Sequence, residues 1–459
     1  KEIQKILTEK DNYGSLQIGK GEKIVLDYSA PNIAKPLGIQ HLLSTIIGQS
    51  LYNIFKKIGF DSVSINHLGD WGTQFGKLIC AYKKWGDKAT VEKDSIAELL
   101  KLYVRFHNEA EKDPSLEDEA RKEFSDFEKG DKENIELWKW FVEESMKEIN
   151  KTYQLLGGIH FDYSQGESFY EDKLADILDE GKEKKVFEKG EDGAYVIHFE
   201  DENIPTLPVQ KKDGATLYIT RDFAALKYRL KTWKPVKILY VVDVAQSIHF
   251  KQLFNAAARL GWYKGEAEHV VFGRMQMKDK SMSTRKGNIV LLNDVVNKAI
   301  ELSEKVIEEK NPELKNKRDV ARVVGIGAIK YNALSQNRVT DIVFDWDKML
   351  SFDGNSAPYL QYTYARARSI LRAEKLPSIQ GEIKQTDEAL VKEKTHALTR
   401  MFPKFSEQIL LSAMEYKPNL LSNYLFELAQ KFNSFYNSVP VLKTDEDSRK
   451  ERLKIVEAS

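Results

Sequence analysis

Three things are scarce in this chain of 459 residues: cysteine, long apolar runs, and an excess of charge of either sign. The single cysteine, Cys80, excludes an internal disulfide and is typical of the reducing cytosol, so we expect a cytoplasmic location. With one cysteine and eight scattered histidines, no zinc-finger spacing exists. No apolar run approaches the length of a membrane span and no signal peptide is visible, so we expect no membrane partner.

The charges balance, with 70 basic and 70 acidic residues. Overall charge alone therefore does not reveal whether the chain binds nucleic acid, and any basic surface has to be local. A composition of 31% charged and 42% hydrophobic residues is typical of a soluble globular protein, and the length predicts two to four domains. The chain starts with Lys1 and stops at Ser459 inside an expected helix, so we expect a trimmed or partial chain.

A β-loop-α-β pattern over residues 24–67 is the most informative segment. Strands are expected at 24–28 and 62–67, and a helix from about Ile39 has apolar residues spaced by three and four. The loop lies where doubly wound sheets bind ligands, and a helix N-terminus presents N–H groups that suit phosphate. His41, in the first turn, could add an imidazole donor; the alternative is a helix cap or a surface histidine. The glycines form neither a G-x-G-x-x-G nor a P-loop pattern, which argues against a nicotinamide-dependent oxidoreductase.

The middle of the chain combines glycine turns, charged helices and a second strand region. Three close glycines at 67–76 indicate a tight functional loop or a structural turn. The charged residues 85–166 predict a helical insertion. After a D-G turn at 213–214 we expect a short apolar stretch and a helix at about 223–230, with Asp222 as its N-cap. Residues 236–242 predict a central parallel strand, followed by Gln246 and His249 just past its end and by another strand at 269–272.

The last third of the chain starts with a basic loop and continues as helices. By pattern alone the lysine-rich residues 278–287 favour an exposed turn over a phosphate site. Helices are expected at 387–411, with Thr386 as N-cap, and at 416–437. From residue 358, tyrosines and arginines share one helix. These side chains could stack on bases and meet phosphate, or could form core and a solvated face.

Five segments, in this order, resemble arginyl-tRNA synthetases of class I: residues 27–48, 67–76, 216–222, 273–290 and 344–372. The first is similar to the family's S-P-N-I-A-K-P segment and "HIGH" motif, the second to its G-D-W-G-x-Q-F-G loop, and the fourth to its "KMSKS" loop. This chain departs from the pattern at a few positions. Gly38 and Gln40 replace the first His and the Gly of the first motif, Leu43 stands where Arg is often found, and Ser281 and Thr284 replace both lysines of the loop.

The resemblance implies an α/β fold: a doubly wound parallel-sheet (Rossmann-like) catalytic domain with a helical insertion, followed by an all-α helical-bundle anticodon-binding domain. We expect an N-terminal connector at 1–22, with the family's extra N-terminal domain absent. The two halves of the catalytic fold would lie at 23–85 and 206–300, separated by a largely helical insertion at 86–205. A helical connector at 301–352 would lead to the bundle at 353–459, incomplete at its C-terminus.

The resemblance also implies an activity, arginine–tRNA ligation. ATP would activate arginine to arginyl-adenylate and pyrophosphate, and arginine would then pass to the 3′-terminal adenosine of tRNA(Arg). ATP with Mg²⁺ would enter as substrate, with no tightly bound cofactor and no zinc. We expect a monomer, and in this family arginine activation generally needs tRNA.

Motif position assigns roles to residues of this chain, again as implied by the resemblance. His41, Lys35 and Lys286 are the expected catalytic residues. The expected ATP-binding residues are Gly38, Gln40, His41, His249, Met282, Ser283, Thr284, Arg285 and Lys286. The expected arginine-binding residues, which include the acids that suit a guanidinium, are Asp27, Ser29, Asn32, Tyr218, Asp222 and Gln246. The expected tRNA-binding residues are Tyr359, Gln361, Tyr362, Arg366 and Arg368.

Two alternatives stay open. The altered motifs are compatible with a catalytically weakened paralogue that binds tRNA. A class I synthetase for another amino acid, such as cysteine or glutamate, is the second alternative. The lack of zinc ligands and the acidic pair Asp27 and Asp222 argue against it.

Overall fold

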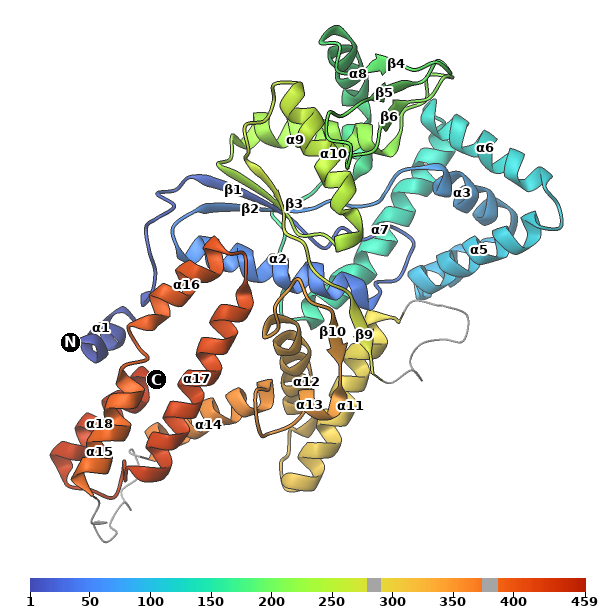
Figure 1. Cartoon of the computed structure of the whole chain (residues 1–459). Helices are drawn as coiled ribbons and strands as arrows, with labels where there is room; N and C mark the ends of the chain where they lie inside the picture. The colour runs from blue at the N-terminus through green and yellow to red at the C-terminus, as the bar shows by residue number, and fades with distance from the viewer. Residues whose placement is uncertain (279–289, 374–386) are drawn as a thin grey trace.

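A five-stranded parallel sheet lies at the centre of the part of the chain that the computed structural model describes, residues 1–278, 290–373 and 387–459 (Figure 1). Its strand order is β3-β2-β1-β7-β8, so the connections run to one side of β1 and then to the other. Such a reversal is the switch point at which doubly wound sheets bind ligands. The strands are β1 (Lys23–Asp27), β2 (Asp61–Asn66), β3 (Tyr163–Ser164), β7 (Lys237–Tyr240) and β8 (Ala267–His269).

Side chains alternate along each strand, so the two faces of the sheet pack against different sets of helices. In β1, Ile24 and Leu26 belong to the core under α2, whereas Val25 belongs to the core that includes α9 and α10. The alternation places Asp27 on the α9 side, two residues after Val25. The covering elements are α2 (Ile39–Lys57), α9 (Tyr218–Trp233), η3 (Val244–Gln246) and α10 (Ser247–Arg259).

Helix α9 begins earlier than the sequence predicts. The expected N-cap, Asp222, lies at the start of the second turn, and Leu217 occupies the N-cap position. The hydroxyl of Thr220 donates a hydrogen bond to the carbonyl of Val209 at 2.8 Å and so ties the first turn to β6 (Leu207–Gln210). This tertiary contact outweighs the local preference of aspartate for a cap.

The charged segment after β2 is helical, as its spacing predicts. It has an apolar core of its own, to which Phe75, Leu99, Phe106 and Phe141 contribute. Gly76 allows the close crossing of α3 and α6, because a Cβ there would lie 2.3 Å from the carbonyl of Ala120. The helices are α3 (Thr73–Trp85), α4 (Lys88–Lys93), α5 (Ser95–Ala110), α6 (Ser115–Glu128) and α7 (Lys132–Leu155).

Between β3 and α9 the chain forms a small layer over the α9 side of the sheet (Figure 1). Its strands pair antiparallel, in the order β4-β5-β6. Its elements other than β6 are η2 (Glu167–Lys173), α8 (Leu174–Glu183), β4 (Glu188–Lys189) and β5 (Tyr195–Ile197).

Beyond the sheet the chain is mostly helical and ends in a bundle that also contacts the N-terminal helix (Figure 1). The expected helix at 387–411 is in fact two helices, with Pro403 in the N-cap position of the second. Asp387 caps the first by accepting from the amide of Ala389 at 2.9 Å; the predicted cap, Thr386, lies outside the described residues. The elements are α1 (Glu2–Glu9), η1 (Lys10–Asn12), β9 (Met275–Met277), α11 (Leu292–Lys310), α12 (Lys317–Leu334), β10 (Ile342–Phe344), α13 (Trp346–Met349), α14 (Ala357–Ala373), α15 (Glu388–Thr399), α16 (Lys404–Met414), α17 (Pro418–Ser438) and α18 (Glu446–Ala458).

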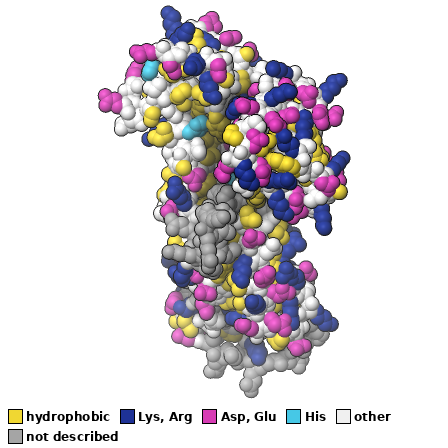
Figure 2. Space-filling view, turned by 90° about the vertical axis from the view of Figure 1, so that its right-hand side faces the viewer, with side chains coloured by type: hydrophobic (Ala, Val, Ile, Leu, Met, Phe, Trp, Pro, Cys, Tyr) yellow, Lys and Arg dark blue, Asp and Glu magenta, His cyan; other side chains and the backbone are white. Residues whose placement is uncertain are grey.

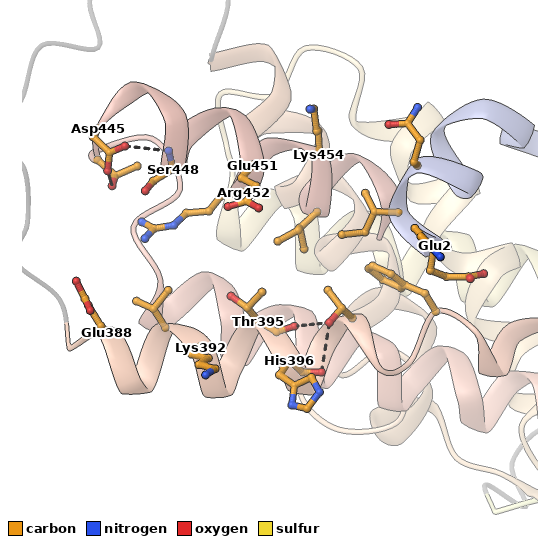
Figure 3. Close-up of a pocket in the computed structure, with 18 residues that line it drawn as sticks. Glu2, Glu388, Lys392, Thr395, His396, Asp445, Ser448, Glu451, Arg452 and Lys454 are labelled. Carbon is orange, nitrogen blue, oxygen red and sulfur yellow. Dashed lines mark hydrogen bonds between the residues drawn. The ribbon is translucent and has the colours of Figure 1, made fainter.

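A hollow lined by α1, α15 and α18 opens in this bundle (Figure 3). Its polar lining mixes both signs of charge, with Glu388 and Glu451 beside Lys392 and Arg452. Of the predicted site residues that belong to the described part of the chain, none lines it. Among the helices in the described residues, none combines the length and the hydropathy needed to cross a membrane.

Candidate active site

The loop between β1 and α2 is held in an unusual backbone conformation by buried hydrogen bonds. Ser29 and Ala30 have positive φ angles of 72° and 48°. The amide of Ser29 donates to the hydroxyl of Ser44 at 2.8 Å, and its own hydroxyl lies 2.7 Å from that of Tyr153. Thr45 donates a further bond to Ser29 Oγ at 2.8 Å. Ser29 is thus placed to shape the loop, and its contact with arginine stays a prediction.

The first turn of α2 holds the ring of His41. The amide of Gly38, at the N-cap, lies 3.0 Å from His41 Nδ1, and the carbonyl of Gly38 lies 3.3 Å from the same atom. Either tautomer of the ring can therefore bond to Gly38. Burial lowers the pKa of His41, which favours the neutral imidazole. His41 can thus offer one N–H from a helix N-terminus, beside the exposed Gln40.

The glycine-rich loop after β2 lies directly against this loop. The amide of Ile33 donates to the carbonyl of Gly69 at 3.1 Å. A Cβ on Gly69 would lie 2.2 Å from Asn32 Oδ1, so a larger residue there would have to displace the Asn32 side chain. Asp70 is buried and accepts from the amide and the hydroxyl of Ser168 at 2.9 and 2.7 Å. The two loops together form one wall at the carboxyl edge of the sheet, with Asn32 exposed on it.

An acidic cluster stands on the other side of that edge. His249 Nε2 lies 3.0 Å from Asp222 Oδ2, and the rings of His249 and Tyr218 have centroids 5.9 Å apart. The charge of Asp222 is the largest cause of a raised pKa at Tyr218, whose side chain is exposed. Gln246 is exposed at the start of α10, one turn before His249. Two predicted arginine-binding residues, Asp222 and Tyr218, therefore meet one predicted ATP-binding residue, His249, and Gln246 lies one turn away.

Glu167 belongs to this cluster although the sequence did not single it out. It follows the two-residue strand β3 and is only 7% exposed. Burial, and then the charge of Asp222, raises the pKa of Glu167 to about 8. The signal that could have revealed it is an acid just past a parallel strand, but β3 is too short to show an apolar pattern.

Asp27 already has a cationic partner. Arg229 Nη1 lies 2.7 Å from Asp27 Oδ2, and the two side chains are 1% and 6% exposed. The guanidinium also lies 5.2 Å from the ring centroid of Tyr240, the residue beside Asp27 in the sheet register. The sequence predicts Asp27 as an arginine-binding acid and does not predict Arg229, which is about 200 residues away.

Lys35 and the basic loop complete the predicted set. The ammonium of Lys35 lies 5.7 Å from the ring centroid of Tyr103, on α5 of the insertion. Residues 281–286, among them the predicted Met282, Ser283, Thr284, Arg285 and Lys286, lie outside the described residues. Just past the loop, the carbonyl of Val290 accepts from the amide of Ile39 at 2.9 Å. The chain beyond the loop is therefore bound to the first turn of α2.

The predicted tRNA-binding residues lie on α14. Arg366 sits between two tyrosine rings, 4.7 Å from the centroid of Tyr362 and 4.8 Å from that of Tyr436. It also donates to Asn433 Oδ1 at 2.6 Å, and Asn433 Nδ2 donates to the hydroxyl of Tyr359 at 3.0 Å. Figure 2 shows basic and acidic side chains interspersed over one face of the molecule.

The two remaining residues that are predicted to bind tRNA, Arg368 and Gln361, differ in exposure. Arg368 is exposed. Gln361 is half-buried, and its amide donates to the carbonyl of Val323 at 3.1 Å.

The family model for the catalytic domain of class I tRNA synthetases (R) matches residues 2–346 of this chain. The chain belongs to the arginyl-tRNA synthetase family. The model of the DALR anticodon binding domain matches residues 360–459. An arginine–tRNA ligase of Alkaliphilus metalliredigens is 46% identical over 99% of this chain and 80% of its own length. One from Clostridium botulinum (strain Langeland) is 45% identical over 100% of this chain and 80% of its own length.

Solved arginyl-tRNA synthetases share the fold. That of Thermus thermophilus superposes with a TM-score of 0.81 at 23% identity, over 100% of this chain and 82% of its own. That of Plasmodium falciparum gives 0.76 at 26% identity, over 95% of this chain and 74% of its own. The predicted family and the predicted fold class are thereby confirmed. The predicted domain boundaries and the roles of single residues stay predictions.

Proposed function

We propose that this chain is an arginine–tRNA ligase, which activates arginine with ATP and transfers it to the terminal adenosine of tRNA(Arg). The observation that carries the proposal is the pairing of two sites at one sheet edge. On one side a helix N-terminus and a neutral histidine offer N–H donors. On the other side Asp222, Glu167 and Tyr218 form an acidic cluster. An arginine bound at the acids and an ATP bound at the helix would meet at the switch point.

For ATP, the proposal gives the chain a role of positioning and charge stabilisation. Nucleotidyl transfer needs little covalent help from the protein, so correctly placed donors supply most of the rate. The ring N–H of His41 and the N-terminus of α2, where the amides of Ile39 and His41 are already bonded to Val290 and Gly38, would meet the phosphates. Lys35 and Lys286 would add charge. Magnesium would come with ATP as part of the substrate.

For arginine, the proposed binding residues are Asp222 and Tyr218, near the N-terminus of α9. A guanidinium is a planar fork of donors that suits a carboxylate and a hydroxyl oxygen. Glu167 adds a third oxygen acceptor within the same cluster. Asn32 and Gln246, both exposed at the edge, would hold the amino and carboxylate ends of the substrate.

The weakened paralogue is motivated by both altered motifs, and Gly38 is one departure in the first of them, which lies within the described residues. Loss of one preorganised donor typically lowers a rate by about 10²–10³-fold, and Gly38 has no side chain to replace the imidazole of the family motif. The exposed Gln40 lies two residues along, in the same turn, and is the candidate substitute.

The decisive experiment is arginine-dependent ATP–pyrophosphate exchange, with and without tRNA(Arg). Exchange that appears only with tRNA supports the ligase together with the family's tRNA requirement. No exchange in either case, with tRNA still bound in a filter assay, contradicts the ligase and favours the paralogue. Light scattering of the same sample tests the proposed monomer, and fractionation of cells tests the proposed cytoplasmic location.

A further inference from the structure

The ion pair between Asp27 and Arg229 is unusual because it is buried next to an apolar core. Arg229 is 1% exposed and lies on α9, where Phe223 and Leu226 belong to that core. Taking two charges out of water costs several kcal/mol each, and apolar replacements of similar volume are often neutral or stabilising. The pair is therefore weak as a device for stability alone.

The geometry of α9 connects Arg229 to the substrate cluster. Asp222 and Arg229 are seven residues apart, which is two helical turns, so they lie on one face of the helix. Asp222 is near the N-terminus of α9, beside Tyr218 and His249. Arg229 lies two turns deeper and reaches Asp27 at the end of β1. Helix α9 thus supplies both Asp222, in the acidic cluster at the sheet edge, and Arg229, which pairs with the buried Asp27.

The polar atoms around the pair are incompletely used. Within the described residues, Arg229 Nε and Nη2 and the hydroxyl of Tyr240 have no hydrogen-bond partner. Asp27 Oδ2 faces Arg229, and within the described residues the Asp27 carboxylate forms no side-chain contact besides this ion pair. The other titratable groups that interact with the pair are Tyr170 on η2, Tyr240 on β7 and Tyr218 on α9. Oδ1 is therefore the acceptor that remains for a ligand.

We propose that Arg229 is a positioning residue for arginine: it holds one oxygen of Asp27 so that the other accepts from a cationic group of the substrate. This inference rests on the proposed function. Without Arg229, Asp27 would be a buried carboxylate free to rotate. With it, the charge of Asp27 is balanced, and the net negative charge left for the substrate resides mainly at Asp222.

The test is a double-mutant cycle on the full chain, with the dissociation constant of arginine measured by calorimetry. Arg229→Met removes the charge and keeps an aliphatic stem, and Asp27→Asn removes the carboxylate. Each single change is expected to weaken arginine about tenfold or more, because a charged hydrogen-bond partner is lost or misplaced. The double variant is expected to bind arginine no more weakly than Asp27→Asn. Arg229→Lys, which keeps the charge and loses the fork, should fall between wild type and Arg229→Met.

The result that overturns the proposal is additivity: a double variant weaker than Asp27→Asn by the full Arg229→Met factor. Arg229→Met could fail to fold, because it leaves a buried carboxylate unpaired. Asp27→Asn carries the same risk, because it leaves Arg229 buried without its partner. Arg229→Lys keeps a cation beside Asp27 and is then compared with wild type alone: weaker arginine binding supports the proposal, and wild-type affinity overturns it.

Two controls separate this inference from a structural effect and from the proposed function. Lys227→Met removes another cation of α9, one that pairs with Glu180 away from the strand ends, and should leave arginine affinity unchanged. In all variants that fold, the KM for ATP should stay within about twofold of the wild-type value, since Arg229 acts on arginine alone. A parallel rise in the KM for ATP and in the dissociation constant of arginine contradicts a positioning role. Calorimetry needs no turnover, so absent exchange in wild type would refute the ligase while the affinity series still tests Arg229.

Discussion

Asp222 is the residue on which arginine recognition depends most directly in the proposed function. It faces His249 and Tyr218, and Asp222 Oδ2 has no hydrogen bond of good geometry within the described residues. We expect Asp222→Ala to raise the KM for arginine about 10- to 100-fold, because hydrogen bonds to charged groups contribute about 1.5–3 kcal/mol. The KM for ATP should change less than about twofold. Steady-state exchange kinetics measure both, with Asp179→Ala on the exposed side of α8 as control; equal rises would count against the assignment.

Glu167 predicts a pH-dependent stability. Its pKa is raised from 4.5 to about 8, so the folded chain holds this proton more tightly than the unfolded chain does. The contribution of Glu167 to stability is therefore present below pH 4.5 and is lost as pH rises toward 8, at about 1.4 kcal/mol per pKa unit. Glu167→Gln removes this loss. In thermal scans, the melting temperature of Glu167→Gln should rise relative to that of wild type between pH 5 and pH 8.5, whereas that of the exposed control Glu183→Gln should not. A difference between Glu167→Gln and wild type that is constant with pH would refute the prediction.

Single residues also show where sequence reasoning stops. His41, Asp222, Tyr218 and Gln246 could be named because motifs fix them locally. Arg229 could not, because the contact that matters joins segments about 200 residues apart and depends on the docking of α9. Glu167 escaped notice for a similar reason: its burial comes from the assembled fold and not from its neighbours in sequence.

At the scale of elements, two glycines of α12 give a matched pair. A Cβ at Gly325 would lie 2.9 Å from the backbone of Ala299 in α11, whereas one at Gly327 would meet only the movable end of Gln361. Both changes to alanine gain helix propensity of about 1 kcal/mol. Gly325→Ala should nevertheless lower stability by about 1–3 kcal/mol, because the backbones have to separate. Gly327→Ala should be neutral or stabilising. Urea unfolding compares them, and equal midpoints would contradict this account of the helix contact.

The elements themselves were predictable where apolar spacing is strong. The helix from Ile39, the strands around it and the apolar strand before Gln246 lie where the pattern places them. The start of α9 was wrong because Thr220 bonds across to β6, a contact invisible in a local pattern. The expected single helix at 387–411 was wrong because Pro403 starts a new helix. Local preference sets an element's type, and tertiary contacts set its ends.

At the scale of the whole molecule, Arg338 joins the catalytic half to the helical bundle. Its Nε donates to the carbonyl of Tyr416 at 2.8 Å, between α16 and α17, and its Nη1 donates to the carbonyl of Val271 after β8. Arg338→Met would leave both carbonyls without this donor, at about 1–3 kcal/mol each. The urea midpoint of Arg338→Met should fall clearly below that of wild type. As control, Arg318→Met removes the exposed ion pair with Glu304, and its free energy of unfolding should stay within about 0.5 kcal/mol of wild type. Similar midpoints would show that Arg338 does not join the two halves.

The order of parts along the chain could be predicted as a whole, because five motifs in sequence outweigh any one of them. Their arrangement in space could not. The sheet order β3-β2-β1-β7-β8 brings β7 beside β1, and no periodicity in either strand specifies that neighbour. The same holds for Val290, which is bonded to the first turn of α2 although it lies about 250 residues further along the chain.

The pairing of β1 with β7 has a consequence for how the chain folds during its synthesis on the ribosome. β2 follows β1 closely, but β7 emerges roughly 210 residues after it. At synthesis rates of about 5–20 residues per second, β1 keeps one unpaired edge for roughly 10–40 s. Over that interval the helical insertion, whose contacts are local, can fold on its own. Until α9 has been made, Asp27 lacks its partner Arg229, and a nascent chain halted before α9 would leave the face of β1 that carries Val25 uncovered.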